Sequence, residues 1–432
     1  MGKDLKTRLE KANKLYKAMQ FKKAGKIFTS VGESYRDLKE YDVAKECFFN
    51  AAKCYLEDGK YLFSIESLRS AGGVSTMNNN FTEANEFYKK ALDYVPNLKR
   101  EANRNEFYIL FSCLSFLTLL NNGNMEDGLN LIKKIKSYVA DKYFLENDLI
   151  RLVKNFTIAI TENKINYIKR IEQEFNKLAF NDLEKNLTKK ALVLAKTHNL
   201  FSTQLNLDKE VYTTNDLITV NLEINTAPLL EINESSFYEY KIKQLKINKI
   251  GIKLSDNFTT QEKPKIPIIL NPGQKENLQF KIKPHFQIEK PLIGPISLTT
   301  EIDGSLIFYH ETSGFLEPNL ISPPPSLEVS TKNLRTPLIG QTFPLEILIE
   351  NKSEGEAIDL NIEVEFPEQL KVMRGTLKKQ IYSLKPNENI RWEINLNPSE
   401  AGDYTIKISM EFNDPDQNKI EDVKEFPLSI KL

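Results

Sequence analysis

The sequence is short of the residues that build most metal and redox centres. Its 432 residues include three cysteines, three histidines and one tryptophan. His198, His285 and His310 lie far apart in the chain, and none has a cysteine or glutamate at metal-ligand spacing. We interpret them as surface or junction residues and expect no metal and no cofactor.

Cysteine usage and the N-terminus indicate a compartment. Cys47, Cys54 and Cys113 occupy apolar positions, which is typical of buried free thiols in a reducing environment. The first helix-like segment is charged throughout and lacks the apolar stretch of a signal peptide. Both features predict a cytoplasmic protein.

Long hydrophobic runs are missing as well. The longest apolar stretch, residues 107–120, is broken by serine and threonine. A transmembrane helix needs about 20 apolar residues, so this stretch is interpreted as a buried helix. Membrane contact is expected to be peripheral at most.

Catalytic motifs are not found either. The sequence has no Gly-x-Ser-x-Gly, no P-loop and no Gly-x-Gly-x-x-Gly. Asp414, Asp416 and Glu421 lie in or beside a predicted hairpin loop without EF-hand spacing, so a polar turn is favoured over a calcium site. We therefore expect no enzyme activity.

The charge is balanced overall but uneven along the chain. Residues 1–200 contain 34 Lys/Arg and 25 Asp/Glu, and residues 201–432 contain the reverse, 25 and 34. This asymmetry predicts either an acidic partner for the first half or docking of the two halves on each other. The excess is too dilute for nucleic acid, which needs a concentrated basic stripe.

An internal repeat occupies the first 100 residues. Aromatic residues recur every 20 positions, each followed at +3 by a small residue and at +7 by a large apolar one. These sets are Phe21, Tyr41, Tyr61 and Phe81, then Ala24, Ala44, Ser64 and Ala84, and finally Phe28, Phe48, Leu68 and Tyr88. The offsets lie on one helix face, so each unit is one helix plus a turn. Stacked pairs with a 40-residue period predict a tetratricopeptide-like α-solenoid.

Helical periodicity continues to about residue 197. The expected helices cover residues 101–120, 125–138, 141–161, 164–178 and 182–197. Beyond residue 200, proline becomes frequent and alternation indicates strands near 217–224, 240–254, 266–270, 277–283, 294–302 and 305–310. Several short strands without helices predict a β-sandwich.

A second β-rich unit follows a stiff linker, Ser322–Pro325. Its strands are expected near 326–331, 343–351, 358–364, 370–373, 379–384, 389–396, 403–412 and 421–431. Trp392 alternates with Ile390 and Ile394 and is predicted to be sandwich core. The expected fold is multidomain α + β, with a helical-repeat domain at 1–199 and two immunoglobulin-like β-sandwiches at 200–321 and 326–432.

The repeat resembles the soluble NSF attachment proteins (SNAPs). The residues that carry the resemblance are Phe21, Ala24-Gly25, Phe28, Tyr41, Ala44, Phe48, Ala51-Ala52 and Tyr55, and Phe107–Lys196 resembles the closing helices of that family. The resemblance implies an adaptor in vesicle-mediated transport that couples a disassembly ATPase to SNARE bundles. Two departures stand out. The link at Met19-Gln20 is tight, so the membrane-touching apolar loop of SNAPs is missing, and β-domains follow where SNAPs contact the ATPase.

The second β-unit resembles immunoglobulin-like adhesion or appendage modules. The similarity rests on Ile349-Glu350-Asn351, Gly355-Glu356-Ala357, Phe366-Pro367, Leu384-Lys385-Pro386 and Ala401-Gly402-Asp403-Tyr404. Many unrelated proteins share this pattern, so it indicates fold rather than function.

Basic residues of the first helices are the candidate partner-binding site. They are Lys14, Lys22, Lys26, Arg36, Lys45 and Lys53. On one concave face they would hold an acidic helical or coiled-coil partner, as the SNAP resemblance implies; the other interpretation is an ordinary solvated surface.

Three functions remain open from the sequence. The first is a non-enzymatic protein-binding scaffold or adaptor, with SNARE-complex remodelling as the narrower version. The second is a coat or appendage-type structural subunit that uses its β-sandwiches for binding or self-assembly, and the third is a regulatory subunit of an enzyme.

Overall fold

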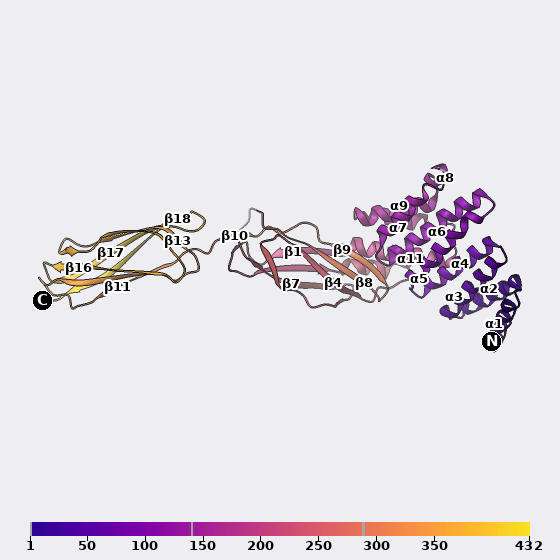
Figure 1. The fold of residues 1–432 in the computed structure, drawn as a ribbon, viewed down its shortest axis with the longest axis horizontal. Coiled ribbons are helices and arrows are strands. Elements are labelled where there is room, and N and C mark those ends of the chain that lie inside the picture. Colours follow the sequence, from indigo (N-terminus) through magenta and orange to yellow (C-terminus); the bar gives the residue numbers. More distant parts are fainter. Residues whose placement is uncertain (1, 140, 287–289) are drawn as a thin grey trace.

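The computed structural model describes residues 2–139, 141–286 and 290–432. A helical array and two β-sandwiches follow one another along an elongated molecule, with the two chain ends at opposite extremes (Figure 1). The expected multidomain α + β fold is confirmed. Among the residues described, no helix is both long enough and apolar enough to cross a membrane.

The repeat predicts the first helices within a residue or two. The array contains α1 (Gly2–Lys17), α2 (Phe21–Asp37), α3 (Tyr41–Glu57), α4 (Tyr61–Met77), α5 (Phe81–Tyr94), α6 (Glu101–Asn121), α7 (Met125–Ile135), α8 (Asp141–Leu145), α9 (Asp148–Thr161), α10 (Ile165–Glu174) and α11 (Asp182–Leu200), with 3₁₀ turns η1 (Val95–Asn97) and η2 (Phe175–Lys177). The single helix expected over 141–161 is wrong. Asn147 accepts a hydrogen bond from Leu149 N at 2.8 Å and so begins a separate helix, α9.

Small residues of the repeat allow the helices to approach closely. Ala24, Ala44, Ser64 and Ala84 are all fully buried. A Cβ on Gly32 would lie 3.1 Å from the ring of Phe48, so glycine lets α2 and α3 pack closely here. Each helix of the series α1 to α7 contacts the next, as expected for an antiparallel stack.

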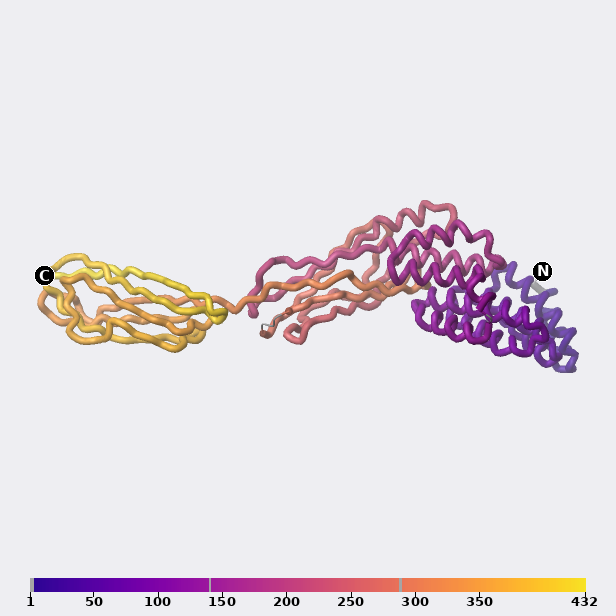
Figure 2. Tube along the Cα trace, turned by 90° about the horizontal axis from the view of Figure 1, so that it is seen from above, coloured from indigo at the N-terminus to yellow at the C-terminus, as the bar shows by residue number. Residues whose placement is uncertain are grey.

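The helix α11 turns back onto the array instead of extending it. It contacts α4, α6, α9 and also strand β9 of the first sandwich. One continuous hydrophobic core therefore runs from the array into that sandwich, through residues such as Leu194, Phe201 and Phe308. The view from above shows this thick joined body and a narrow waist before the last domain (Figure 2).

The first sandwich has two four-stranded sheets, ordered β1-β3-β7-β5 and β6-β4-β8-β9, and a small parallel pair, β10-β2. Its strands are β1 (Ser202–Leu207), β2 (Val211–Thr213), β3 (Ile218–Asn225), β4 (Leu245–Leu254), β5 (Phe258–Glu262), β6 (Ile268–Leu270), β7 (Lys275–Pro284), β8 (Ile293–Ile302), β9 (Leu306–Glu311) and β10 (Asn319–Ile321). The expectation of no helices here is wrong. The turn η3 (Ala227–Leu229) and helix α12 (Leu230–Glu234) bury Leu229 and Ile232 against α11.

The second sandwich pairs sheets β11-β12-β16-β14 and β15-β13-β17-β18, all antiparallel. Its strands are β11 (Leu327–Asn333), β12 (Phe343–Asn351), β13 (Ala357–Glu365), β14 (Leu370–Arg374), β15 (Lys378–Leu384), β16 (Asn389–Pro398), β17 (Gly402–Asn413) and β18 (Lys419–Ile430). Trp392 packs against this core but is only half-buried, with the Lys379 ammonium 5.0 Å from its ring.

The linker between the sandwiches is held by side chains of the second one. Asp416, in the β17–β18 turn, accepts hydrogen bonds from Ser322 N at 2.9 Å and Ser322 Oγ at 3.0 Å. Gly355 lies so close that a Cβ there would be 2.0 Å from the carbonyl oxygen of Pro323. The acidic loop between β17 and β18 thus contacts the linker.

Candidate partner-binding surface

The six predicted cations are divided among three helices. Lys14 lies on α1, Lys22, Lys26 and Arg36 lie on α2, and Lys45 and Lys53 lie on α3. Lys14, Lys22, Lys26 and Lys53 are exposed, whereas Arg36 is half-buried and pairs with its neighbour Asp37 at 3.0 Å.

Lys45 ties α3 to α5. Its ammonium lies 3.0 Å from the carboxylate of Glu83, which also accepts hydrogen bonds from Asn80 and Ser75. Burial lowers the pKa of Lys45, but the hydrogen bond and charge of Glu83 outweigh it and raise the pKa above its ordinary value. This lysine is therefore a structural cation with a partner already in place.

Lys53 lies beside an aromatic ring. Its ammonium is 4.2 Å from the centroid of Phe49, and the ammonium of Lys90, from α5, is 5.0 Å from the same ring. Phe49 in turn contacts Phe87 at 5.4 Å between centroids. The two lysines thus flank a partly buried aromatic pair, an arrangement in which the ring faces partly compensate the ammonium charges.

The face of α4 and α6 is covered by the chain's own α11. The guanidinium of Arg69, on α4, forms two hydrogen bonds of 2.6 and 2.8 Å with Glu184, on α11. Lys190 extends from α11 to Thr76 O at 2.7 Å and Asn79 Oδ1 at 2.6 Å, and burial lowers its pKa to about 8. A partner helix cannot occupy this face without displacing α11. The end of the array formed by α1–α3 is not covered by α11 and stays accessible.

The two edges of the array, where the turns lie, differ in how their helices begin. Antiparallel stacking places the α1–α2, α3–α4 and α5–α6 turns along one edge, here called the first turn edge. The N-cap residues there are Gln20, Lys60 and Arg100, and none caps its helix with a side-chain hydrogen bond. The amides at these three helix starts therefore have no side-chain cap, and α6 alone of the three has a carboxylate, Glu101, in its first turn.

Of the helices α3, α5 and α7, which begin on the opposite edge, α5 and α7 have a side-chain cap and α3 has none. Asn80 accepts a hydrogen bond from Glu83 N, and Asn124 accepts one from Asp127 N. The first turns of α3, α5 and α7 all carry carboxylates, whereas on the first turn edge α6 carries Glu101 and α2 and α4 carry none. Sequence reasoning missed this contrast, although Gln20, Lys60 and Arg100 follow the 40-residue period of the repeat.

A groove lies on the first turn edge between its second and third turns. It has a volume of about 380 Å³ and is lined by Gly59–Phe63, Asn97–Arg100 and Asn103. Leu62 is 40% exposed and Phe63 is 54% exposed, which is high for such side chains. We call this feature the turn groove.

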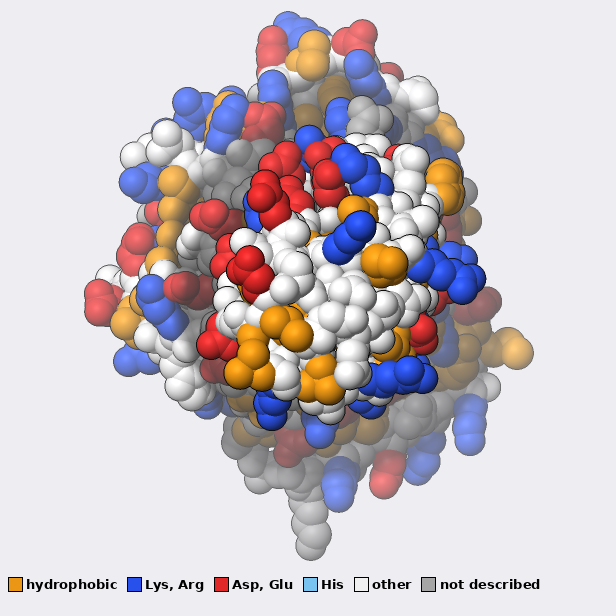
Figure 3. All heavy atoms as spheres, turned by 90° about the vertical axis from the view of Figure 1, so that its left-hand side faces the viewer, with side chains coloured by type: hydrophobic (Ala, Val, Ile, Leu, Met, Phe, Trp, Pro, Cys, Tyr) orange, Lys and Arg blue, Asp and Glu red, His pale blue; other side chains and the backbone are white. Residues whose placement is uncertain are grey.

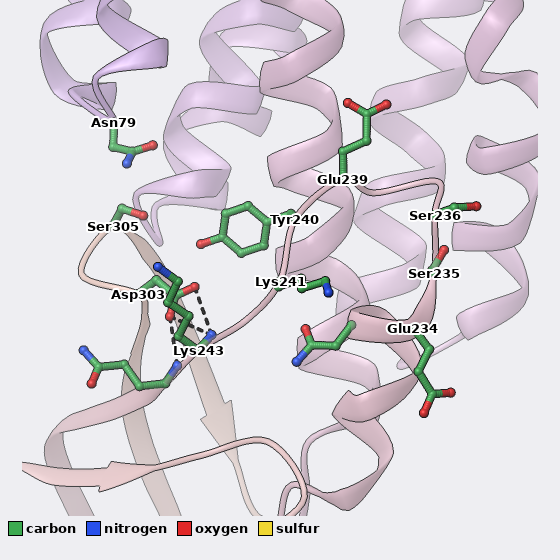
Figure 4. A pocket seen from close by; sticks show the side chains of 12 residues that line it. Asn79, Glu234, Ser235, Ser236, Glu239, Tyr240, Lys241, Lys243, Asp303 and Ser305 are labelled. Carbon is green, nitrogen blue, oxygen red and sulfur yellow. Dashed lines mark hydrogen bonds between the residues drawn. The ribbon is translucent and has the colours of Figure 1, made fainter.

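A larger, polar cleft lies where the array meets the first sandwich (Figure 4). Its volume is about 980 Å³, and Asn79, Tyr240, Lys241 and Ser305 line it. The carboxylate of Asp303 already has partners within the chain. It accepts hydrogen bonds of 2.9–3.3 Å from the backbone amides of Lys243 and Gln244. These interactions hold the loop before β4 in place.

Lysines of α11 explain part of the charge asymmetry. Lys196 pairs with Glu231 at 2.7 Å, and Lys189 pairs with Glu239 at 2.8 Å. Both carboxylates belong to the segment that follows β3, so basic residues of the first half and acidic residues of the second half do dock on each other. The basic residues at the N-terminal end of the array form no such ion pairs with the second half among the described residues.

Histidines and cysteines take structural positions. His198 and His310 meet at the array–sandwich junction, 5.9 Å apart between ring centroids, and His285 is exposed and bonds with Thr259. No group of metal-ligating side chains occurs in the described part of the chain. The three cysteines, all buried and with free thiols, are Cys47, Cys54 and Cys113. Burial raises the pKa of the Cys47 and Cys54 thiols to about 11.

Comparison with known proteins supports the array's assignment. Residues 4–105 match the family model described as soluble NSF attachment protein, SNAP. This stretch contains α1 to α5, so the N-terminal part of the chain is a SNAP-like helical repeat. The comparison with curated proteins found no match.

Two solved structures show weak similarity. The CARDB domain of a Pyrococcus furiosus protein, crystallised with di-metal ions, is 21% identical over 25% of this chain and 90% of its own, with a TM-score of 0.19. Red sea bream transglutaminase is 10% identical, and the match covers 59% of this chain and 34% of the transglutaminase, with a TM-score of 0.20. At these TM-scores no property of either protein is transferred to this chain.

Proposed function

We propose that this protein is a non-enzymatic adaptor whose helical array binds an acidic helical or coiled-coil segment of a partner protein. The observation that carries the proposal is the basic, uncovered N-terminal end of a SNAP-like repeat. Residues 1–30 contain nine Lys/Arg and two Asp/Glu. The helix α1 contacts α2 in the series, and seven of these cations are exposed: Lys6, Lys11, Lys14, Lys17, Lys22, Lys23 and Lys26.

In this function the β-sandwiches position the bound partner. The array and the first sandwich share a hydrophobic core, and the linker to the second sandwich is bonded to Asp416. A partner held at the array would therefore lie at a set distance from the second sandwich. By the SNAP resemblance, the partner would be a SNARE-type bundle and the setting cytoplasmic vesicle traffic.

The test uses the full-length chain as bait in cell lysate at low and at moderate salt. The charge-reversal variant Lys14→Glu/Lys22→Glu/Lys26→Glu is compared with a control of equal charge, Lys249→Glu/Lys263→Glu/Lys265→Glu, on the first sandwich. An acidic helical partner should elute as salt rises, be lost in the first variant and remain with the control. Equal binding by both variants would refute the proposal.

The alternative function is a coat or appendage-type subunit that assembles through its sandwiches. One observation favours it: Leu334, just after β11, and Ile339, beside Lys431 at the C-terminal end, are exposed. The end-on view of the second sandwich also shows hydrophobic side chains on this face (Figure 3). This function predicts a mass that rises with protein concentration and returns to the monomer in a Leu334→Ser/Ile339→Ser variant.

A further inference from the structure

The turn groove has the shape of a peptide-binding site for one or two side chains. Phe63 is fixed at its rim by the ring of Tyr55, 5.4 Å away between centroids. Together with Leu62 it presents apolar surface to solvent beside a cavity of about 380 Å³. An exposed apolar patch next to a cavity is typical of a binding surface. The cavity volume is smaller than one turn of a helix about 10 Å wide with its side chains, so an extended segment is the occupant that we expect.

The charged side chains that line the turn groove are all basic. Its charged lining residues are Lys60, Lys99 and Arg100, and no carboxylate from the part of the chain that the structure describes lines it. Lys60 pairs with Asp58 at 2.6 Å, while Lys99 and Arg100 are exposed and take part in none of the ion pairs of the described residues. Arg104 donates to Leu98 O at 2.7 Å and so holds the α5–α6 turn in position. Charge complementarity therefore selects an acidic occupant.

We infer that the turn groove binds an extended acidic peptide segment with an apolar anchor residue. The anchor packs beside Leu62 and Phe63, and the flanking carboxylates pair with Lys99 and Arg100. The inference rests on the proposed adaptor function and places one contact with the acidic partner at the turn edge, away from the cations of α1–α3.

The experiment uses the full-length protein and a labelled synthetic peptide in which glutamates flank a central Leu-Phe pair. Fluorescence anisotropy at low salt measures binding. The variant Lys99→Glu/Arg100→Glu should bind about tenfold more weakly or worse, while the distant control Lys263→Glu/Lys265→Glu binds like the unmodified chain. A peptide with Ser-Ser in place of Leu-Phe should bind more weakly to all of them.

A second readout locates the peptide. Phe63→Trp places a fluorophore at the turn groove, and Leu38→Trp places one on the opposite edge, where Leu38 is 46% exposed. The background from Trp392 is the same in both. The peptide should shift the emission of Phe63→Trp to the blue and leave that of Leu38→Trp unchanged.

Several results would overturn the inference. They are no peptide binding, equal weakening in the control, or an emission change on the opposite edge. Sedimentation of the protein with phosphatidylserine vesicles through Lys99 and Arg100, without peptide binding, would make the groove a lipid contact and would also refute it. One result would refute the turn groove as a binding site and still support the adaptor function. In it, the peptide does not bind, but an acidic partner from lysate still binds the Lys99→Glu/Arg100→Glu variant. Peptide binding without any acidic partner in lysate would support the turn groove as a binding site and refute the adaptor function.

Discussion

Arg69 and Glu184 join two helices that are 115 positions apart in the sequence by a bidentate ion pair. The Glu184 side chain is 1% exposed and the Arg69 side chain is 19% exposed. Glu184 also completes the capping box of α11, because its carboxylate accepts a hydrogen bond from Asn181 N at 2.9 Å. One carboxylate therefore both begins α11 and attaches it to α4.

Removing one partner of this pair should be costly. Arg69→Met leaves a buried carboxylate without its counter-charge, and we expect the free energy of unfolding to fall by about 3–5 kcal/mol. The double variant Arg69→Met/Glu184→Leu should recover much of this loss, because neither charge then needs solvation. Urea unfolding followed by circular dichroism measures both. Additive losses in the double variant would show that the pair is not coupled.

The junction histidines should make the protein acid-sensitive. Burial and, to a smaller extent, the charge of the nearby His198 together lower the pKa of His310 to about 4; burial also lowers the pKa of His198. Because the unfolded chain binds protons near pH 6.5 and the folded chain does not, stability is complete above about pH 6.5 and falls as the pH drops toward 4, by roughly 2–3 kcal/mol for His310. Urea unfolding at pH 7 and at pH 5 measures this loss.

Two variants test whether the junction histidines cause this pH dependence. His310→Gln should reduce the pH dependence, because Gln cannot gain a proton in this range. His285→Gln is the control, since His285 is exposed. An unchanged pH dependence in His310→Gln would contradict the assignment.

Gly72 is required by the ring of Tyr88. A Cβ at position 72 would lie 2.4 Å from Tyr88 Cε1, on a ring that is fully buried. Gly72→Ala should therefore lower the free energy of unfolding by roughly 1–3 kcal/mol, although alanine is the better helix former. Ser70→Ala, on the same helix, is the control and should change stability little. Tyr88→Leu in the Gly72→Ala background should relieve the contact, and a fully stable Gly72→Ala would contradict this account.

The repeat was predictable because its pattern is local. Phe21, Ala24 and Phe28 set a helix face within eight residues, and the following units repeat it, so α2 to α5 match the expected units closely. The break between α8 and α9 was missed because apolar periodicity continues across Asn147, and only a side-chain cap divides the helices. The helix α12 was missed because it is short and owes its position to burial against α11.

The candidate site was less predictable, because it depends on contacts between distant segments. Nothing near Lys45 in the sequence shows that Glu83 will neutralise it, and nothing near Arg69 points to Glu184. The turn groove forms from residues 59–63 and 97–103, which only the stacking of α3 to α6 brings together. Whether the six cations form one binding face stays a prediction.

The hydrogen bonds of Asp416 should control how freely the second sandwich moves. In Asp416→Ala, Ser322 loses two hydrogen bonds, so we expect a broader range of interdomain distances and a larger mean radius of gyration by small-angle X-ray scattering. The free energy of unfolding of the sandwich itself should change by no more than about 1 kcal/mol, because the turn is at the surface. Glu425→Ala is the matched control, an exposed carboxylate on β18 away from the linker. The same scattering curve for Asp416→Ala and the control would mean that the proline linker alone, through its restricted backbone, sets the spacing of the two sandwiches.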